Sequence, residues 1–129
     1  AQSERVLGAV LGARLLSARA GLIVGPGDRT QRLTSWLHRI ATQERVVVPA
    51  SGNATPVAFV DVRDLAAWLV AAAGADWSGA VNATGPVGMT TYGAMVEACR
   101  DAVAASGVPA AELVPVPEAA LLAAGVEPW

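Results

Sequence analysis

Two hydrophobic periods alternate along this chain, and the alternation restricts the folds it can adopt. Apolar residues first recur at helical spacing and predict a helix over about residues 3–15: Val6, Leu7, Val10, Leu11 and Leu15. Residues 16–24 then form a mostly apolar run that ends in Gly25-Pro26-Gly27, which is typical of a strand buried on both faces and closed by a turn. Helical and strand-like segments continue to alternate, which favours an α/β fold over an all-α or all-β fold.

The segment from residue 28 to 53 predicts a helix, a strand and a turn. Asp28 offers an N-cap with Gln31 three residues later, a capping-box arrangement. The helix that follows has an apolar stripe and leaves His38 in solvent; the stripe contains Leu33, Trp36, Leu37 and Ile40. A β-branched strand is expected over residues 45–48, with Pro49 ending it and residues 51–53 forming a turn.

The rest of the chain continues the same alternation. A strand is expected over residues 57–60, followed by a helix that Asp61 caps and that runs to about Ala73, with Asp64 in its first turn. Further strands are expected over residues 80–83 and 112–116. Thr90 is expected to cap a helix, and Pro117 suits the first position of a terminal helix. The Thr90 helix carries an apolar set of Met95, Val96, Cys99, Val103 and Ala104.

The predicted strand over residues 16–24 has a consequence for the whole sheet. A parallel strand that is buried on both faces needs neighbouring strands and crossover helices. The preceding residues are too few to supply them, so we expect the chain to be part of a larger sheet.

Composition and charge exclude several classes of function. The 53% apolar content supports a folded core, while a net charge of −2 and a pI near 5.2 argue against a nucleic-acid surface. All nine basic residues are Arg, so the chain offers no Schiff-base Lys and no phosphate-loop Lys. One Cys and one His cannot form a disulfide or a zinc cluster, and Cys99 is expected in the core. The longest apolar run is too short to span a bilayer and no signal peptide is recognisable, so a cytoplasmic protein is expected.

Two clusters of residues could be interpreted as a cofactor loop and as a catalytic pair, but a structural role explains each of them. The glycines at positions 21, 25 and 27 do not form a Gly-x-Gly-x-x-Gly dinucleotide fingerprint, because the spacing differs and Pro26 lacks a backbone donor. Asp61 and Asp64 could serve as paired carboxylates, but their position at a helix start favours capping.

Four segments, taken in order, resemble one enzyme family. They are Arg19-Ala20-Gly21-Leu22-Ile23-Val24-Gly25-Pro26-Gly27-Asp28, Phe59-Val60-Asp61-Val62-Arg63-Asp64-Leu65-Ala66, Ala80-Val81-Asn82-Ala83-Thr84-Gly85-Pro86, and Met89-Thr90 before a helix. Each segment is similar to a signature of the extended short-chain dehydrogenase/reductases, the NAD-dependent epimerase/dehydratase family. Together the four signatures span residues 19–90 in the order that the family has them.

The resemblance implies a fold and a place within it. Residues 1–129 would be the C-terminal part of an NAD(P)-binding domain, comprising part of a Rossmann-like doubly wound parallel sheet and a small α/β substrate-binding subdomain. Residues 1–28 would be the last helix and strand of the Rossmann core. Residues 29–129 would mainly bind substrate, with residues 79–84 returning to the core sheet. The segment Ala1–Leu7 resembles the sequence that directly follows the family's catalytic Tyr-x-x-x-Lys, so the catalytic pair and the Gly-rich cofactor loop would precede it, and no catalytic residue is expected here.

The implied chemistry is hydride transfer between a small substrate and NAD or NADP. Gly21, Leu22 and Ile23 match family positions that approach the cofactor. Leu22, Val24 and Arg63 are expected on the substrate side. Leu22 stands where nucleotide-sugar epimerases carry Asn, and Val24 where they carry Tyr, which favours a more apolar carbonyl or hydroxyl substrate.

Two alternatives remain open at this point. The chain could belong to a non-catalytic regulatory or protein-binding module that keeps the NAD(P)-binding fold. It could also be a small domain that pairs with a separately encoded N-terminal half, and a homodimer is open as well. For the enzyme that the resemblance implies, the expected partners are a small-molecule substrate and the missing N-terminal half of the same enzyme, with no nucleic acid and no membrane.

Overall fold

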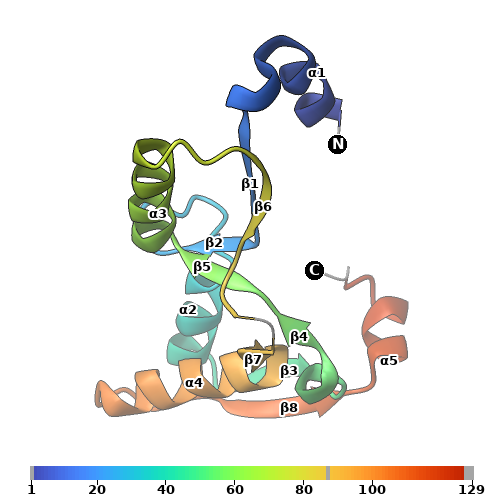
Figure 1. Cartoon of the computed structure of the whole chain (residues 1–129). Coiled ribbons are helices and arrows are strands. Elements are labelled where there is room, and N and C mark those ends of the chain that lie inside the picture. The colour runs from blue at the N-terminus through green and yellow to red at the C-terminus, as the bar shows by residue number, and fades with distance from the viewer. Residues whose placement is uncertain (1, 87, 127–129) are drawn as a thin grey trace. The chain divides into compact units, whose positions relative to one another are not determined.

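The computed structural model describes residues 2–86 and 88–126, apart from the side chain of residue 53. It shows a mixed α/β protein whose short strands pair two by two, and three of these four pairs are parallel (Figure 1). The α/β class expected from the alternating periods is therefore confirmed. The elements, in chain order, are α1 (Gln2–Leu11), β1 (Leu16–Ala20), β2 (Leu22–Val24), α2 (Thr34–Thr42), β3 (Arg45–Pro49), β4 (Pro56–Val57), β5 (Phe59–Asp61), α3 (Val62–Gly74), β6 (Gly79–Ala83), β7 (Thr90–Thr91), α4 (Tyr92–Ala105), β8 (Glu112–Val116) and α5 (Glu118–Ala123).

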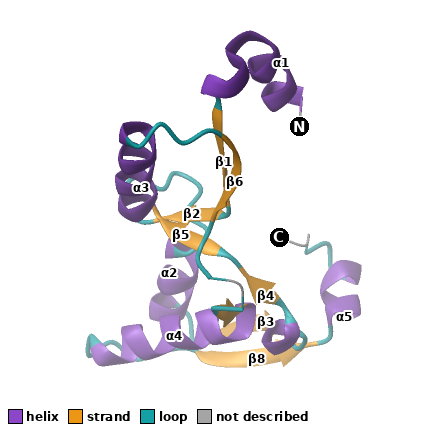
Figure 2. Ribbon diagram, in the orientation of Figure 1, coloured by secondary structure: helices purple, strands orange, loops and turns teal. Residues whose placement is uncertain are grey.

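The chain divides into two compact units, each built from two separate stretches of sequence. Unit 1 comprises residues 1–28 and 58–87, and unit 2 comprises residues 29–57 and 88–129. Figure 2 shows that both units mix helices with short strands. The unit boundary at residues 57–58 cuts the expected strand over residues 57–60 into β4 and β5, which belong to different units. The prediction of one continuous strand there was wrong.

Unit 1 contains two parallel strand pairs. β1 pairs with β6, from Leu16 opposite Gly79 to Ala20 opposite Ala83. β2 pairs with β5, with Val24 opposite Asp61 at the carboxyl ends. The single strand predicted over residues 16–24 is thus two strands that have different partners.

The predicted burial of this region on both faces was also wrong. Of its residues only Val24 is buried, whereas Arg19 and Ala20 are exposed and the Ile23 side chain is 40% exposed. The physical reason is that, within the described residues, each strand has one neighbour, so its other edge and much of its surface are uncovered.

α1 is joined to the rest of unit 1 by polar contacts. The helix ends at Leu11, earlier than predicted, because Gly12 adopts a left-handed backbone (φ +55°) and begins a 3₁₀ turn. Glu4 accepts hydrogen bonds from Ser17 Oγ (2.6 Å) and from Arg19 Nε (2.8 Å) on β1. The Arg19 guanidinium contributes most to holding the pKa of Glu4 well below its usual range.

α3 begins as the sequence predicts. The Asp61 carboxylate accepts a hydrogen bond from the backbone N–H of Arg63 (2.8 Å), which satisfies one of the free donors of the first turn. Asp64 lies in that turn, and the helix ends at Gly74, one residue beyond the expected end.

Unit 2 holds most of the core. α2 and α4 pack together, and the five-residue parallel ladder of β3 with β8 lies beside them (Figure 1). Ile40 and Val96 are almost completely buried, and the Trp36 and Tyr92 rings pack edge to face at a centroid distance of 5.7 Å. Two residues of the apolar stripe predicted for α2, Trp36 and Ile40, are buried in the core. The predicted exposure of His38 is confirmed. Cys99 is buried, as expected, and burial raises the pKa of its thiol.

Three helix starts differ from the predicted ones. Asp28 and Gln31 do not cap α2, which begins at Thr34, because Gln31 has a left-handed backbone (φ +52°) that a helix cannot continue through. Thr91, rather than Thr90, caps α4, and its hydroxyl accepts a hydrogen bond from the Ala94 N–H. Pro117 is the residue before α5 instead of its first residue.

The helices within the described ranges include none that combines the length and the apolar character needed to cross a membrane.

Candidate functional site

Gly21 marks the point where the chain of unit 1 changes its partner strand. The Gly21 N–H donates to the carbonyl of Ala83 at the end of β6, and the Leu22 N–H donates to the carbonyl of Ala58 before β5 (2.9 Å). A Cβ atom at Gly21 would lie 2.7 Å from the Ala58 oxygen and 2.9 Å from the Thr84 methyl carbon. The close approach of three chain segments therefore requires glycine at this position. We name Gly21, Ala58 and Thr84 the strand junction.

The other residues of the predicted cofactor set lie on β2. Leu22 is half-buried and Ile23 exposes 40% of its surface. Since successive side chains of a strand point to opposite faces, Leu22 and Ile23 cannot meet one small ligand through the same face. The space next to Gly21 is filled by the protein itself, so the glycine is explained without a cofactor.

The carboxyl ends of β2 and β5 bring together two parts of the predicted substrate side. Val24 is buried and lies opposite Asp61. Gly25 begins the turn with φ +117°, and a Cβ there would lie 3.3 Å from Asp61 Oδ2. Crevices at the carboxyl ends of parallel strands are where open α/β sheets bind ligands.

Arg63 is engaged by a carboxylate of its own segment. Its Nε donates to Asp61 Oδ1 (2.9 Å) and its Nη2 donates to Asp61 Oδ2 (2.7 Å). This bidentate contact raises the pKa of Arg63 and lowers the pKa of Asp61 to about 2. Arg63 is 73% exposed, so a ligand can still reach the guanidinium, although its charge is already balanced.

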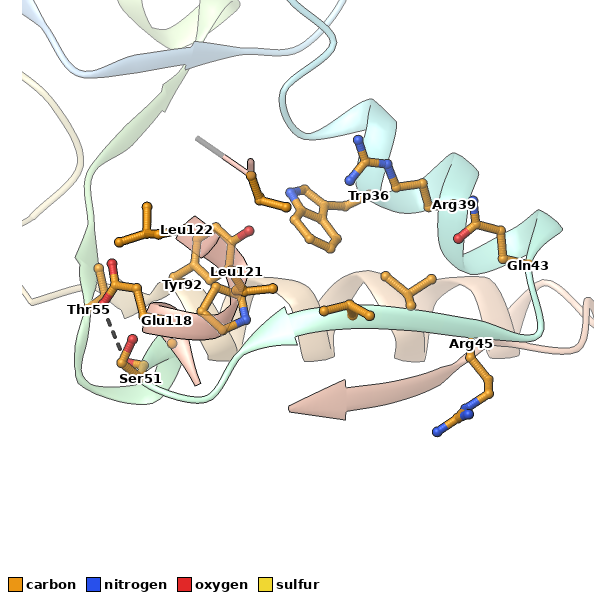
Figure 3. A pocket seen from close by; sticks show the side chains of 15 residues that line it. Trp36, Arg39, Gln43, Arg45, Ser51, Thr55, Tyr92, Glu118, Leu121 and Leu122 are labelled. Carbon is orange, nitrogen blue, oxygen red and sulfur yellow. Dashed lines mark hydrogen bonds between the residues drawn. The ribbon is translucent and has the colours of Figure 1, made fainter. Parts of the chain in front are cut away.

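Unit 2 contains a cavity that the sequence did not indicate. It has a volume of about 790 Å³ and is lined by α2, β3, the turn after β3, the start of α4 and α5 (Figure 3). This volume lies within the range of small-molecule sites, roughly 300–1,000 Å³. The lining is largely apolar and includes Leu121 and Leu122 of α5.

Two aromatic rings and an arginine form one part of the cavity wall. The Trp36 and Tyr92 rings meet at 90°, and the guanidinium carbon of Arg39 lies 5.4 Å from the Trp36 ring centroid. Burial raises the pKa of the Tyr92 hydroxyl to about 12, so it stays protonated at neutral pH. Arg39 follows Trp36 by one helical turn, which places both side chains on one face of α2.

The remaining charges of the wall are distributed unevenly. Arg45 pairs with Glu112 (3.2 Å), and Figure 3 shows its side chain pointing away from the other labelled residues. Glu118 at the start of α5 is the single carboxylate among the described lining residues, and Figure 3 shows it apart from Arg39. The described lining contains neither His nor Cys.

Sequence reasoning missed this cavity because its parts are far apart in the chain. The helical spacing of Trp36 and Arg39 was a usable local signal, whereas the contact with Tyr92 depends on how α2 and α4 pack. In the described part of the chain no three His, Cys, Asp or Glu side chains form a metal-binding group.

The chain matches no protein-family model, no curated protein sequence and no solved structure at a significant level.

Proposed function

We propose that the chain is the substrate-binding part of a cytoplasmic, nicotinamide-dependent oxidoreductase or epimerase, and that it is inactive alone. The substrate would be a small, rather apolar carbonyl or hydroxyl compound. The catalytic pair and most of the NAD or NADP site would lie in an N-terminal half of the same protein.

One observation carries this proposal: three segments with separate family resemblances meet at the strand junction. Residues 19–28 supply the end of β1 and all of β2, residues 59–66 supply β5 and the start of α3, and residues 80–86 supply most of β6. The Gly85 N–H donates to the Phe59 carbonyl (3.0 Å), which ties the third segment to the second. A resemblance that arose by chance in each segment would not require the three to be neighbours in space.

The open strand pairs of unit 1 support a larger parallel sheet. β1 and β6 run parallel and, among the described elements, pair only with each other. Each has a free edge whose N–H and C=O groups could continue a sheet. In the proposed full protein, β1 and β6 would be the last strands of a Rossmann-like sheet.

The residues of this chain could contact a bound nicotinamide only through apolar side chains. Bound NAD or NADP would supply or accept the hydride. Leu22 or Ile23, which lie on opposite faces of β2, would offer the apolar surface, and Gly21 serves the strand junction. Val24 and the Asp61–Arg63 pair, at the carboxyl ends of β2 and β5, would line the substrate side.

The coding sequence upstream of Ala1 provides the sharpest test. We expect a Lys directly before Ala1, a Tyr four residues before that Lys, and a Gly-x-x-Gly-x-x-Gly near the distant N-terminus. The protein expressed from that whole reading frame should oxidise NADH or NADPH in the presence of an apolar carbonyl compound, and the 129-residue chain should not. An upstream stop codon or an unrelated upstream domain would overturn the proposal. A cofactor loop without the Tyr and Lys would favour the non-catalytic module.

A further inference from the structure

The cavity of unit 2 has features that select a particular class of ligand. All of its lining residues belong to unit 2, so the inference does not depend on the nicotinamide chemistry proposed above. We propose that this cavity binds a small aromatic carboxylate, with its carboxylate at Arg39 and its ring between Leu122 of α5 and the accessible part of the Trp36–Tyr92 wall.

The aromatic part of the proposal rests on the wall itself. Trp36 and Tyr92 are 5% and 8% exposed, so packing within unit 2 holds both rings in place and each presents only a small part of its surface to the cavity. Rings fixed in this way bind a planar ligand without losing side-chain freedom. Leu122 on α5 is 50% exposed and adds apolar surface that a ligand ring could cover.

The carboxylate part rests on the distribution of charge. Arg39 forms no ion pair with a described residue, and its position over the Trp36 ring leaves its N–H groups available to an acceptor. The other basic residue of the lining, Arg45, is paired with Glu112. A guanidinium binds a carboxylate through two parallel hydrogen bonds, a geometry that a neutral ligand does not reproduce.

Glu118 determines the orientation of such a ligand. It is the single described acidic residue in the lining, and Figure 3 shows it on α5, apart from Arg39 on α2. Repulsion from its carboxylate disfavours an anionic group at the α5 end. The ligand would therefore lie with its charged group toward α2 and its apolar edge toward α5.

Calorimetric titration of the full chain with 2-naphthoate and with the neutral 2-naphthamide tests this arrangement. We expect 2-naphthoate to bind at one site, roughly tenfold more tightly than 2-naphthamide, because a charge-assisted bidentate contact contributes about this much at a solvent-accessible site. Arg39→Gln should abolish the preference for the carboxylate and leave the binding of 2-naphthamide unchanged.

Arg45→Gln is the matched control, since it removes the same charge from the same lining but from a side chain that points away. It should keep the preference for 2-naphthoate. The indole resonance of Trp36, assigned with Trp36→Phe, should shift on titration. The proposal is overturned if neither ligand binds, if Arg39→Gln keeps the preference, or if Arg45→Gln loses it to the same extent. Far-ultraviolet circular dichroism of each variant confirms that the fold is retained.

Discussion

Units 1 and 2 are similar in size and both contain a five-residue parallel strand pair, but they bury very different amounts of apolar surface. Nine of the twelve buried apolar side chains of the described chain belong to unit 2. Unit 1 contributes Val24, Leu65 and Ala72, while Val6, Val10 and Val70 are more than half exposed. The β1–β6 and β3–β8 ladders thus have the same length and direction in different surroundings.

The difference shows that backbone pairing and burial are separate contributions to a fold. In unit 2 one face of the ladder packs against α2 and buries Val46, so the hydrophobic effect stabilises it. In unit 1 the ladder forms, but neither β1 nor β6 contains a buried residue. Contiguous exposed apolar patches often mark docking sites, and the proposed N-terminal half would cover exposed apolar residues of unit 1.

The largest expected effect comes from the core of unit 2. Ile40→Ala should lower the free energy of unfolding by about 2–5 kcal/mol, because Ile40 is completely buried and the cavity left behind cannot collapse fully. Urea denaturation followed by circular dichroism measures this. Val47→Thr on exposed β3 surface is the control and should change stability by less than about 0.5 kcal/mol. A small effect of Ile40→Ala would mean that unit 2 has no cooperative core.

Gly21→Ala should disturb unit 1 next most strongly. The added Cβ would lie 2.7 Å from a backbone oxygen that cannot move without breaking the β2–β5 pair, and we expect a cost of about 1–3 kcal/mol. Resonances of β2 and β5 should shift while those of β3 and β8 stay in place. Gly74→Ala at the end of α3, which has open space around it, should be neutral or stabilising by up to about 1 kcal/mol. If both variants behaved alike, the strand junction would not need its glycine.

Hydrogen exchange compares the two ladders directly. Amides of β3, whose Val46 is buried, should exchange at least about tenfold more slowly than those of β1, because local opening of β1 exposes little apolar surface. Nuclear magnetic resonance of the chain in deuterated buffer gives both rates in one sample. Equal protection of β1 and β3 would contradict the contrast between the units.

The smallest expected effect is the acid response of the α3 cap. The folded pKa of Asp61 is about 2, below its ordinary value of 3.8, mainly because of the hydrogen bond from the Arg63 side chain. A lowered folded pKa means that the contribution to stability is complete well above the ordinary pKa of 3.8 and is lost as the pH falls through about 2. The Asp61 carboxyl carbon should titrate in that window, and Asp61→Asn should flatten the dependence of unit 1 stability on pH there. A titration midpoint near 3.8 would show that the Asp61–Arg63 contact does not persist in solution.

The elements predicted well are those whose signals are local. The cap of α3 depends on Asp61 and the next two residues, and the apolar spacing of Met95, Val96, Cys99 and Val103 is a property of one helix. β8 begins and ends at the expected residues, Glu112 and Val116. The expected start of α2 failed because a capping pattern does not reveal the left-handed backbone of Gln31.

The candidate sites show the same division between local and distant information. The sequence indicated the Gly25–Gly27 turn and the position of Arg63. It did not indicate that Arg63 pairs with Asp61, because an Arg in the first turn of a helix has several possible partners nearby. It also gave no sign of the unit 2 cavity, whose wall joins Trp36 of α2 to Tyr92 of α4 and to α5.

The amino-acid sequence alone determined the α/β class, the apolar residues of α2 and α4 in unit 2, and the resemblance on which the proposed function rests. Only the tertiary structure decided that residues 16–24 break into two strands at Gly21, that residues 57–60 divide between two units, and that an aromatic cavity lies in unit 2. Helical spacing and capping are interactions over three or four residues and can be read along the chain. The choice of a partner strand depends on which distant segment offers the better hydrogen bonds and packing, and that competition is settled only when the chain is folded.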